Sequence, residues 1–218
     1  MSLTHELRLA ADHVWRKILD HPFVIELFSG ELPLNKFKYY IVQDYNYLLT
    51  MYRCFSLIAS KADYKLARKA LELAYIEATT EMANYEKLLN KLGMTLDEVV
   101  SIEPAPTNIA YMNYLISTCA LKSPIHGIVA LLPCFWSYGE IAEKHKDMLS
   151  RNKNELYVEW AKTYITNEYR ELINELRRFV DEYGSSHDKE EFKKIFITAS
   201  KYEYMFWNMS YVMETWPL

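Results

Sequence analysis

Hydrophobic residues recur at intervals of three and four along most of this chain, which is the spacing of amphipathic helices. The first such segment covers Thr4–Asp20, and His21-Pro22 ends it. A short connector is expected over Phe23–Leu32, followed by Pro33 at a helix start. The long helical segments, the scarcity of strand signals and the absence of repeats predict an all-α bundle that forms a single domain over residues 1–218.

The rest of the chain continues in the same rhythm, punctuated by short breaks. Gly93 is expected to stop one helix, Glu103–Thr107 to form a linker with Thr107 as a helix cap, and Gly184-Ser-Ser to form a loop. The carboxylates of the helix after Ala62 are expected to form a mostly solvated face: Glu72, Glu77, Glu81 and Glu86. The further helical segments are expected at Phe37–Ile58, Ala62–Leu92, Thr95–Glu98 (a short turn), from Thr107 through Cys119, from Pro124 through Ile141, from Asn152 through Tyr164, at Glu168–Tyr183 and at Lys189–Met213.

Asp44 is a charged residue on an otherwise apolar helix face. The face consists of Phe37, Ile41, Asp44, Leu48, Met51, Phe55 and Ile58. Because burying an isolated charge is very costly, a carboxylate on such a face must be hydrogen-bonded, paired or functional. Tyr47 lies one turn along on the same side, so Asp44 is either a structural tie to a tyrosine or part of a site.

Glu203 occupies the equivalent place in the last helix. Its face consists of Phe192, Phe196, Ala199, Glu203, Phe206, Ser210 and Met213, and Phe206 and Trp207 lie one turn beyond the glutamate. A structural tie to a nearby hydroxyl or amide is again the alternative to a functional role.

Cys134 follows Pro133 inside a mostly apolar and aromatic helical stretch. Proline within a helix leaves the carbonyl of Val129 without its usual donor and generally kinks the helix. A thiol beside such a kink, with Tyr138 one turn on, is a candidate for chemistry, although a lone cysteine is more often a small core residue.

Composition narrows the class of protein. Of 218 residues, half are hydrophobic and 18 are Tyr, whereas only 5 Gly and 7 Pro supply turn chemistry, which disfavours a many-stranded sheet. The formal charge of -4 gives neither a basic footprint for nucleic acid nor a polybasic membrane surface. The richest apolar run, Ile125–Trp136, is shorter than a membrane span, and the charged N-terminus predicts a helix and not a signal peptide.

The cysteines indicate a reducing compartment, and so a cytoplasmic protein. They are odd in number and lack the CxxC spacing of zinc sites, and Cys54 and Cys119 are expected in the core. No His follows a Glu at the Glu-x-x-His spacing of di-iron bundles, and no Gly-rich phosphate loop is present. We therefore expect no metal and no cofactor, although His13, His21 or His126 leave a single haem ligand as an alternative.

Three helices thus each contribute one reactive group where a hydrophobe is expected, each with an aromatic side chain one turn away. A pocket of aromatic rings with a few polar groups suits a flat heteroaromatic ligand. A thiol can act as nucleophile, and a carboxyl group whose pKa is raised by burial can act as general acid and base. Aromatic residues at helical spacing are also typical of ordinary core, so the pattern alone leaves both interpretations open.

The chain resembles the TenA proteins, or thiaminase II. The resemblance spans nearly the whole chain and rests on the order and spacing of three blocks: Leu32-Pro-Leu-Asn-Lys-Phe-Lys-Tyr-Tyr-Ile-Val-Gln-Asp44, Ala130-Leu-Leu-Pro-Cys-Phe-Trp136 and Ser200-Lys-Tyr-Glu-Tyr-Met-Phe-Trp207. It implies a haem-oxygenase-like helical fold without haem, a homotetramer, and hydrolysis of a small-molecule pyrimidine in thiamin salvage. The implied reaction converts 4-amino-5-aminomethyl-2-methylpyrimidine to the hydroxymethylpyrimidine and ammonia, and thiamin is a further candidate substrate.

The resemblance also implies roles for individual residues. Cys134 matches the catalytic thiol, Glu203 the catalytic acid and base, and Asp44 the carboxylate that holds the aminopyrimidine. The aromatic and hydroxyl lining of the pocket is matched by Tyr47, Tyr111, Tyr138, Tyr164 and Phe206.

Three other functions stay open at this point. The first is a pyrimidine-binding protein without turnover. Activity of the wild type, and its loss when Cys134 is changed, would distinguish the enzyme from such a protein. The second is a haem- or quinone-handling oxidoreductase of the PqqC or haem oxygenase kind, which would be coloured when purified. The third, a DNA-binding regulator, is disfavoured by the charge balance.

Overall fold

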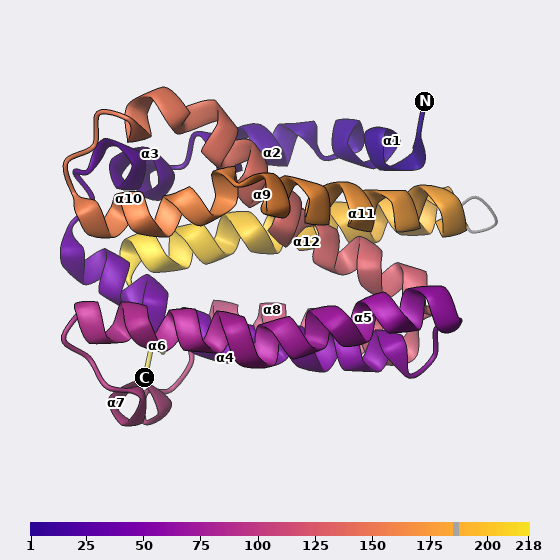
Figure 1. Cartoon of the computed structure of the whole chain (residues 1–218), viewed down its shortest axis with the longest axis horizontal. Coiled ribbons are helices and arrows are strands. Elements are labelled where there is room, and N and C mark those ends of the chain that lie inside the picture. The colour runs from indigo at the N-terminus through magenta and orange to yellow at the C-terminus, as the bar shows by residue number, and fades with distance from the viewer. Residues whose placement is uncertain (185–187) are drawn as a thin grey trace. The chain divides into compact units, whose positions relative to one another are not determined.

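Every regular element in the part of the chain that the structure describes is helical (Figure 1). The structure is a computed structural model that describes residues 1–184 and 188–218, so most of the loop expected at Gly184-Ser-Ser lies outside the described residues. The all-α prediction is confirmed. The chain divides into two compact units: unit 1 comprises Met1–Pro33 and Ile128–Asn208, and unit 2 comprises Leu34–Gly127 and Met209–Leu218. The single domain over residues 1–218 stays a prediction.

Unit 1 collects helices from both ends of the sequence. In chain order its elements are α1 (Leu3–Ala10), α2 (Asp12–Leu19), α3 (Pro22–Ser29), most of α9 (Pro124–Leu149), α10 (Glu155–Lys162), the short 3₁₀ helix η2 (Thr163–Ile165), α11 (Asn167–Tyr183) and most of α12 (Lys189–Val212). Helix α1 packs against α11, and α3 packs against α10 (Figure 1).

Two expectations for the N-terminal part of unit 1 were wrong. The helix expected over Thr4–Asp20 is divided at Ala11 into α1 and α2. The expected connector Phe23–Leu32 mostly forms α3, because the His21 side chain accepts a hydrogen bond from the Phe23 N–H and caps a helix whose first residue is Pro22. Gly30 ends this helix in the left-handed conformation, with φ +88°.

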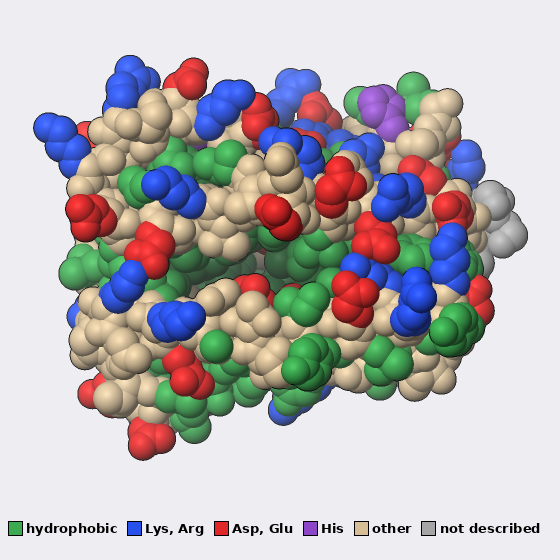
Figure 2. All heavy atoms as spheres, in the orientation of Figure 1, with side chains coloured by type: hydrophobic (Ala, Val, Ile, Leu, Met, Phe, Trp, Pro, Cys, Tyr) green, Lys and Arg blue, Asp and Glu red, His purple; other side chains and the backbone are tan. Residues whose placement is uncertain are grey.

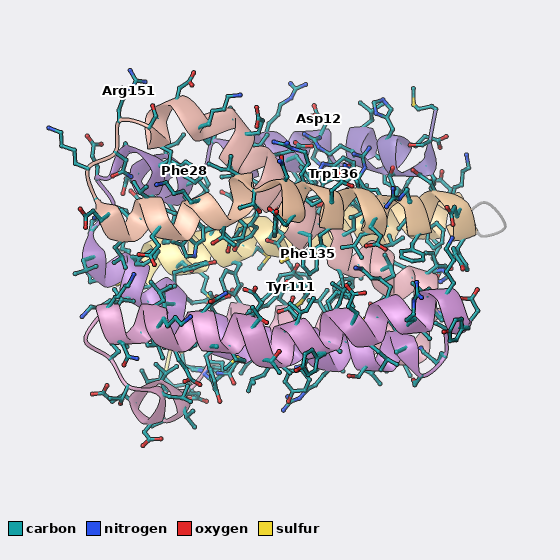
Figure 3. The ribbon with its side chains drawn as sticks, viewed as in Figure 1. Asp12, Phe28, Tyr111, Phe135, Trp136 and Arg151 are labelled. Carbon is teal, nitrogen blue, oxygen red and sulfur yellow. The ribbon has the colours of Figure 1, made fainter. Side chains whose placement is uncertain are left out.

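An aromatic core holds α2, α9 and α12 of unit 1 together. The Trp15 and Phe196 rings stack with centroids 5.8 Å apart, and Trp15 meets Trp136 edge-on at 5.5 Å. The Trp15 indole N–H donates to the Ser200 hydroxyl across 2.8 Å, which satisfies the polar end of this buried ring. Figure 3 shows Trp136, together with Phe135, on α9. This packing fixes the helix faces next to Cys134 and Glu203.

Unit 2 is built around the long helix α4 (Leu34–Ala59). Its other elements are α5 (Tyr64–Ile76), the π-helical turn η1 (Glu77–Glu81), α6 (Met82–Lys91), α7 (Leu96–Val100), α8 (Pro106–Leu121), the first turn of α9 and the last turn of α12. Helix α4 packs against α5, η1, α6, α7 and α8 (Figure 1). The helix expected over Ala62–Leu92 is therefore present, but a π turn interrupts it.

The start of α8 differs from the sequence expectation. Ala105 is the N-cap and Pro106 the first helical residue, so the linker after Glu103 is shorter than expected and Thr107 lies inside the helix. The Thr107 N–H and hydroxyl both donate to the Glu214 carboxylate, each across 2.9 Å. Glu214 thus supplies from the C-terminal segment the cap that Thr107 was expected to provide.

Lys61 closes the other end of α8. Its ammonium group donates to the backbone carbonyls of Cys119, Ala120 and Lys122. The last carbonyls of a helix have no partners within the helix and carry partial negative charge, so a cation at this place satisfies them and stabilises the helix end.

Helix α9 is long and apolar. Among the described residues it alone is long and apolar enough to cross a membrane by length and composition, but 83% of its most apolar window is buried within the protein. That burial is typical of a core helix. Pro133 lies within it, as expected, one residue before Cys134.

Candidate active-site residues

Unit 1 carries five of the eight candidate residues. Cys134 and Tyr138 come from α9, Tyr164 from η2, and Glu203 and Phe206 from α12. Cys134 is half-buried, whereas Cys54 and Cys119 are fully buried, so the expectation that these two are core residues is confirmed and Cys134 is the more accessible thiol.

Tyr138 and Tyr164 lie together in an aromatic cluster. Their ring centroids are 4.9 Å apart, and Tyr138 also lies 5.0 Å from Trp207 and 6.0 Å from Trp160. Trp160 in turn lies 4.9 Å from Tyr164. We call these four residues the Tyr138 cluster. Their tilted and edge-on geometry is favourable between aromatic rings.

Trp160 and Trp207 were not among the candidate residues. Helical spacing gave a signal for both, because Trp160 lies one turn before Tyr164 and Trp207 one turn after Glu203. Tyr169 extends the cluster: its ring lies 5.1 Å from Tyr164, and its hydroxyl donates to the Phe135 carbonyl across 3.0 Å. That bond ties the start of α11 to the turn of α9 that carries Cys134.

Glu203 is 2% exposed and Phe206 is 4% exposed, which confirms that the face of α12 expected from the sequence is buried. On α9, the Ser137 hydroxyl donates to the Cys134 carbonyl across 3.4 Å, one turn below the proline. Unit 1 therefore holds a thiol on α9, a buried carboxyl group on α12 and an aromatic cluster on α9, α10, η2 and α12.

Unit 2 carries the other three candidate residues. The hydroxyl of Tyr47 on α4 donates to that of Tyr111 on α8 across 3.4 Å, and the two ring centroids are 5.3 Å apart. Both tyrosines are buried (Figure 3 labels Tyr111). Asp44 is half-buried on α4, one turn before Tyr47. The structure thus brings Tyr47 and Tyr111 together, next to the helical turn that carries Asp44.

The environment of Asp44 is acidic and aromatic. The Asp44 charge contributes to raising the pKa of Glu77 in η1 and of Tyr85 in α6, in both cases after burial as the larger cause. The Tyr85 hydroxyl donates to the Ile41 carbonyl across 2.8 Å, and its ring lies 5.9 Å from that of Tyr45. The Asp44 charge therefore acts on groups of η1 and α6, both of which pack against α4 within unit 2.

Glu77 corrects the expectation of a solvated carboxylate face. Glu72 and Glu86 are exposed as expected, but Glu77 is only 7% exposed. Burial, with the charges of Glu81 and Asp44, raises the pKa of Glu77 to about 8. The signal was present in the sequence, because Glu77 continues the core face of this helix: Leu66, Ala70, Leu73, Glu77, Tyr85 and Leu89.

Two of the three histidines considered as haem ligands have structural partners, and the third, His13, is exposed. His21 caps α3, and burial lowers its pKa to about 4. A ring nitrogen of His126 is hydrogen-bonded to the Ser123 hydroxyl at 2.6 Å, next to the start of α9. Across residues 1–184 and 188–218, no group of three His, Cys, Asp or Glu side chains is placed to hold a metal ion.

Comparison with known proteins adds independent findings. The family model described as TENA/THI-4/PQQC family matches residues 9–213. A curated protein of Halalkalibacterium halodurans named aminopyrimidine aminohydrolase is 34% identical, and the match covers 99% of this chain and 98% of that protein.

Solved structures agree with the fold. A TenA homologue from P. horikoshii OT3 superposes with a TM-score of 0.95 at 46% identity, covering 97% of this chain and 99% of that one. A domain with a heme oxygenase-like fold from Shewanella denitrificans superposes with a TM-score of 0.78 at 14% identity, covering 98% and 93% of the two chains. The expected haem-oxygenase-like fold is confirmed.

Proposed function

Because the chain belongs to the TENA/THI-4/PQQC family, we propose that it is an aminopyrimidine aminohydrolase, or thiaminase II, that acts in thiamin salvage. Its substrate is 4-amino-5-aminomethyl-2-methylpyrimidine, which it converts to the hydroxymethylpyrimidine and ammonia, and it cleaves thiamin as a second substrate. The observation that carries this proposal is the full-length likeness to a protein named aminopyrimidine aminohydrolase, at 34% identity. The half-buried Cys134 and the buried Glu203 supply groups suited to the reaction.

In the proposed mechanism Cys134 is the nucleophile and Glu203 the general acid and base. The Cys134 thiolate forms a bond to a ring carbon while Glu203 transfers its proton to a ring nitrogen. The electron pair gained by the ring then expels the amine from the exocyclic methylene, and the amine, which is protonated in the bound substrate, leaves as ammonia. Water adds at the methylene and releases a proton to the solvent, the ring nitrogen returns its proton to Glu203, and the thiolate departs.

The remaining candidate residues bind and orient the ring. Asp44 accepts a hydrogen bond from the amino group of the pyrimidine, and Tyr47 and Tyr111 act as a hydrogen-bonded pair next to it. Tyr138 and Tyr164, which belong to the Tyr138 cluster, and Phe206 provide aromatic surface for the flat ring. No cofactor takes part in these steps.

The test is ammonia release from 4-amino-5-aminomethyl-2-methylpyrimidine by the wild type and by Cys134→Ala. We expect turnover by the wild type and none by the variant, which should still bind the pyrimidine. The matched control is Cys54→Ala, which removes a fully buried thiol and should keep activity. Full activity of Cys134→Ala would overturn the role of Cys134, and binding without turnover by the wild type would establish a pyrimidine-binding protein instead.

We also propose that the protein is a cytoplasmic homotetramer. The outer face of α5 supports a contact between subunits, because Tyr64, Leu71 and Tyr75 share it and are 82%, 58% and 70% exposed. Figure 2 shows hydrophobic side chains at the surface over α5. Light scattering after size exclusion should give four times the chain mass of 25.8 kDa, and Leu71→Glu should reduce it. A monomeric wild type would contradict the proposal.

A further inference from the structure

A buried carboxyl group faces the proposed pyrimidine-binding residue in unit 2. Glu77 begins the π turn η1, and this turn packs against α4, the helix that carries Asp44. Glu77 is 7% exposed, whereas Glu72 before it and Glu86 beyond it are exposed and Glu81 is half-buried. π turns are rare and frequently occur at functional sites, because the wider turn redirects the side chains around it.

Two carboxylates act on Glu77. The charges of Glu81 in the same turn and of Asp44 on α4 both raise its pKa, after burial as the larger cause, and the same Asp44 charge acts on Tyr85 of α6. Lys69, two turns earlier on α5, forms an ion pair with Glu72 at 2.9 Å. A carboxyl group that is buried beside other carboxylates holds its proton at neutral pH, because its charged form loses contact with water and is repelled by the neighbouring negative charges.

We propose that Glu77 is a positioning residue for Asp44: Glu77 holds the proton of the pair, so that Asp44 alone is ionised and accepts from the amino group of the pyrimidine. This inference rests on the function proposed above and adds a residue to it. The two carboxyl groups then behave as a dyad that carries one negative charge at neutral pH. Glu77 does not touch the substrate.

The dyad makes pyrimidine binding dependent on pH. When Glu77 loses its proton, a further negative charge arises beside Asp44 and Glu81, and the repulsion between η1 and α4 displaces the acceptor. Binding should therefore weaken through the pH at which Glu77 titrates, near 8. The expected loss is about tenfold, which corresponds to a coupling of about one pH unit between the two groups.

The experiment measures the dissociation constant of 4-amino-5-hydroxymethyl-2-methylpyrimidine by calorimetry between pH 6 and pH 9.5. This compound lacks the titrating aminomethyl group of the substrate. Wild type and Glu77→Gln should bind equally at pH 6. Above pH 8 the wild type should bind about tenfold more weakly, whereas Glu77→Gln should show no change. Glu86→Gln, which alters an exposed carboxylate of the same helix, should behave as the wild type.

A second variant keeps the test decisive if Glu77→Gln does not fold. Glu81→Gln removes one of the charges that raise the pKa of Glu77, so the pH of weakened binding should move down. A wild-type curve with no change near pH 8, or the same change in Glu77→Gln, would overturn the role of Glu77 and leave the enzyme assignment intact. Absence of both binding and ammonia release at every pH would overturn the proposed function, and the role of Glu77 with it.

Discussion

The buried carboxyl group of Glu77 should make the stability of the protein fall with rising pH. Its pKa is raised from an ordinary value of 4.5 to about 8 in the folded protein. Between these two values the folded state holds a proton that the unfolded state has lost. Unfolding free energy therefore decreases as pH rises through this interval, and levels off above pH 8.

The size of the effect follows from the two pKa values. One pH unit of difference is worth about 1.4 kcal/mol, so the whole interval corresponds to about 5 kcal/mol, an upper bound because the protein relaxes around the charge. The glutamine in Glu77→Gln cannot ionise, so the variant loses none of this stability as the pH rises. The unfolding free energy of the variant should therefore equal that of the wild type at pH 4.5. It should then exceed the wild-type value by about 1 kcal/mol more for each pH unit up to pH 8.

The assay is urea unfolding followed by circular dichroism from pH 4.5 to pH 9, at one fixed protein concentration because assembly contributes to stability. Glu86→Gln is the matched control, since Glu86 is exposed on α6. It should follow the wild type at every pH. Parallel curves for wild type and Glu77→Gln would show that Glu77 ionises in the folded protein at its ordinary pH, and would refute the reasoning.

Two further predictions concern the helix ends. Gly30→Ala should lower the free energy of unfolding by about 2 kcal/mol, more than Gly93→Ala. Both glycines have positive φ, but only at Gly30 would the added Cβ atom lie 2.5 Å from the Asn152 side chain. Equal losses for the two variants in thermal unfolding would contradict this. Burial and the Glu214 charge raise the pKa of Tyr39 to about 12, so Glu214→Gln should lower it. An ultraviolet titration of tyrosine that is the same in the variant would contradict the role of the Glu214 charge.

Helical periodicity predicted the long elements and the faces they bury. In α12 the core face from Phe192 to Phe206 is buried as expected, with Glu203 included, because this helix has one apolar stripe against polar residues. The same reasoning missed α3. Its sequence is apolar on nearly every side, so periodicity carries no signal there, and its boundaries depend on the His21 cap and on Gly30.

The sequence predicted which residue types belong to the candidate site better than it predicted which side chains contact one another. Asp44 and Glu203 were found because each is a charge within an apolar face. Glu77 follows the same rule, but the exposed glutamates around it made the whole row resemble a solvated surface. The pairing of Tyr138 with Tyr164, and of Tyr47 with Tyr111, joins separate helices, and spacing within one helix does not contain that information.

The three carbonyls that surround Lys61 have a consequence for chemical modification. A lysine amine reacts with acylating reagents only as the free base. The Lys61 ammonium group donates all three of its hydrogen bonds to backbone oxygens, which favours the charged form. Lys61 should therefore be among the last lysines labelled in the folded protein, although it is exposed, whereas Lys87, which is also exposed, reacts early. Mass spectrometry of partially acetylated protein would then report the integrity of the end of α8, since acetylation at Lys61 requires that end to open.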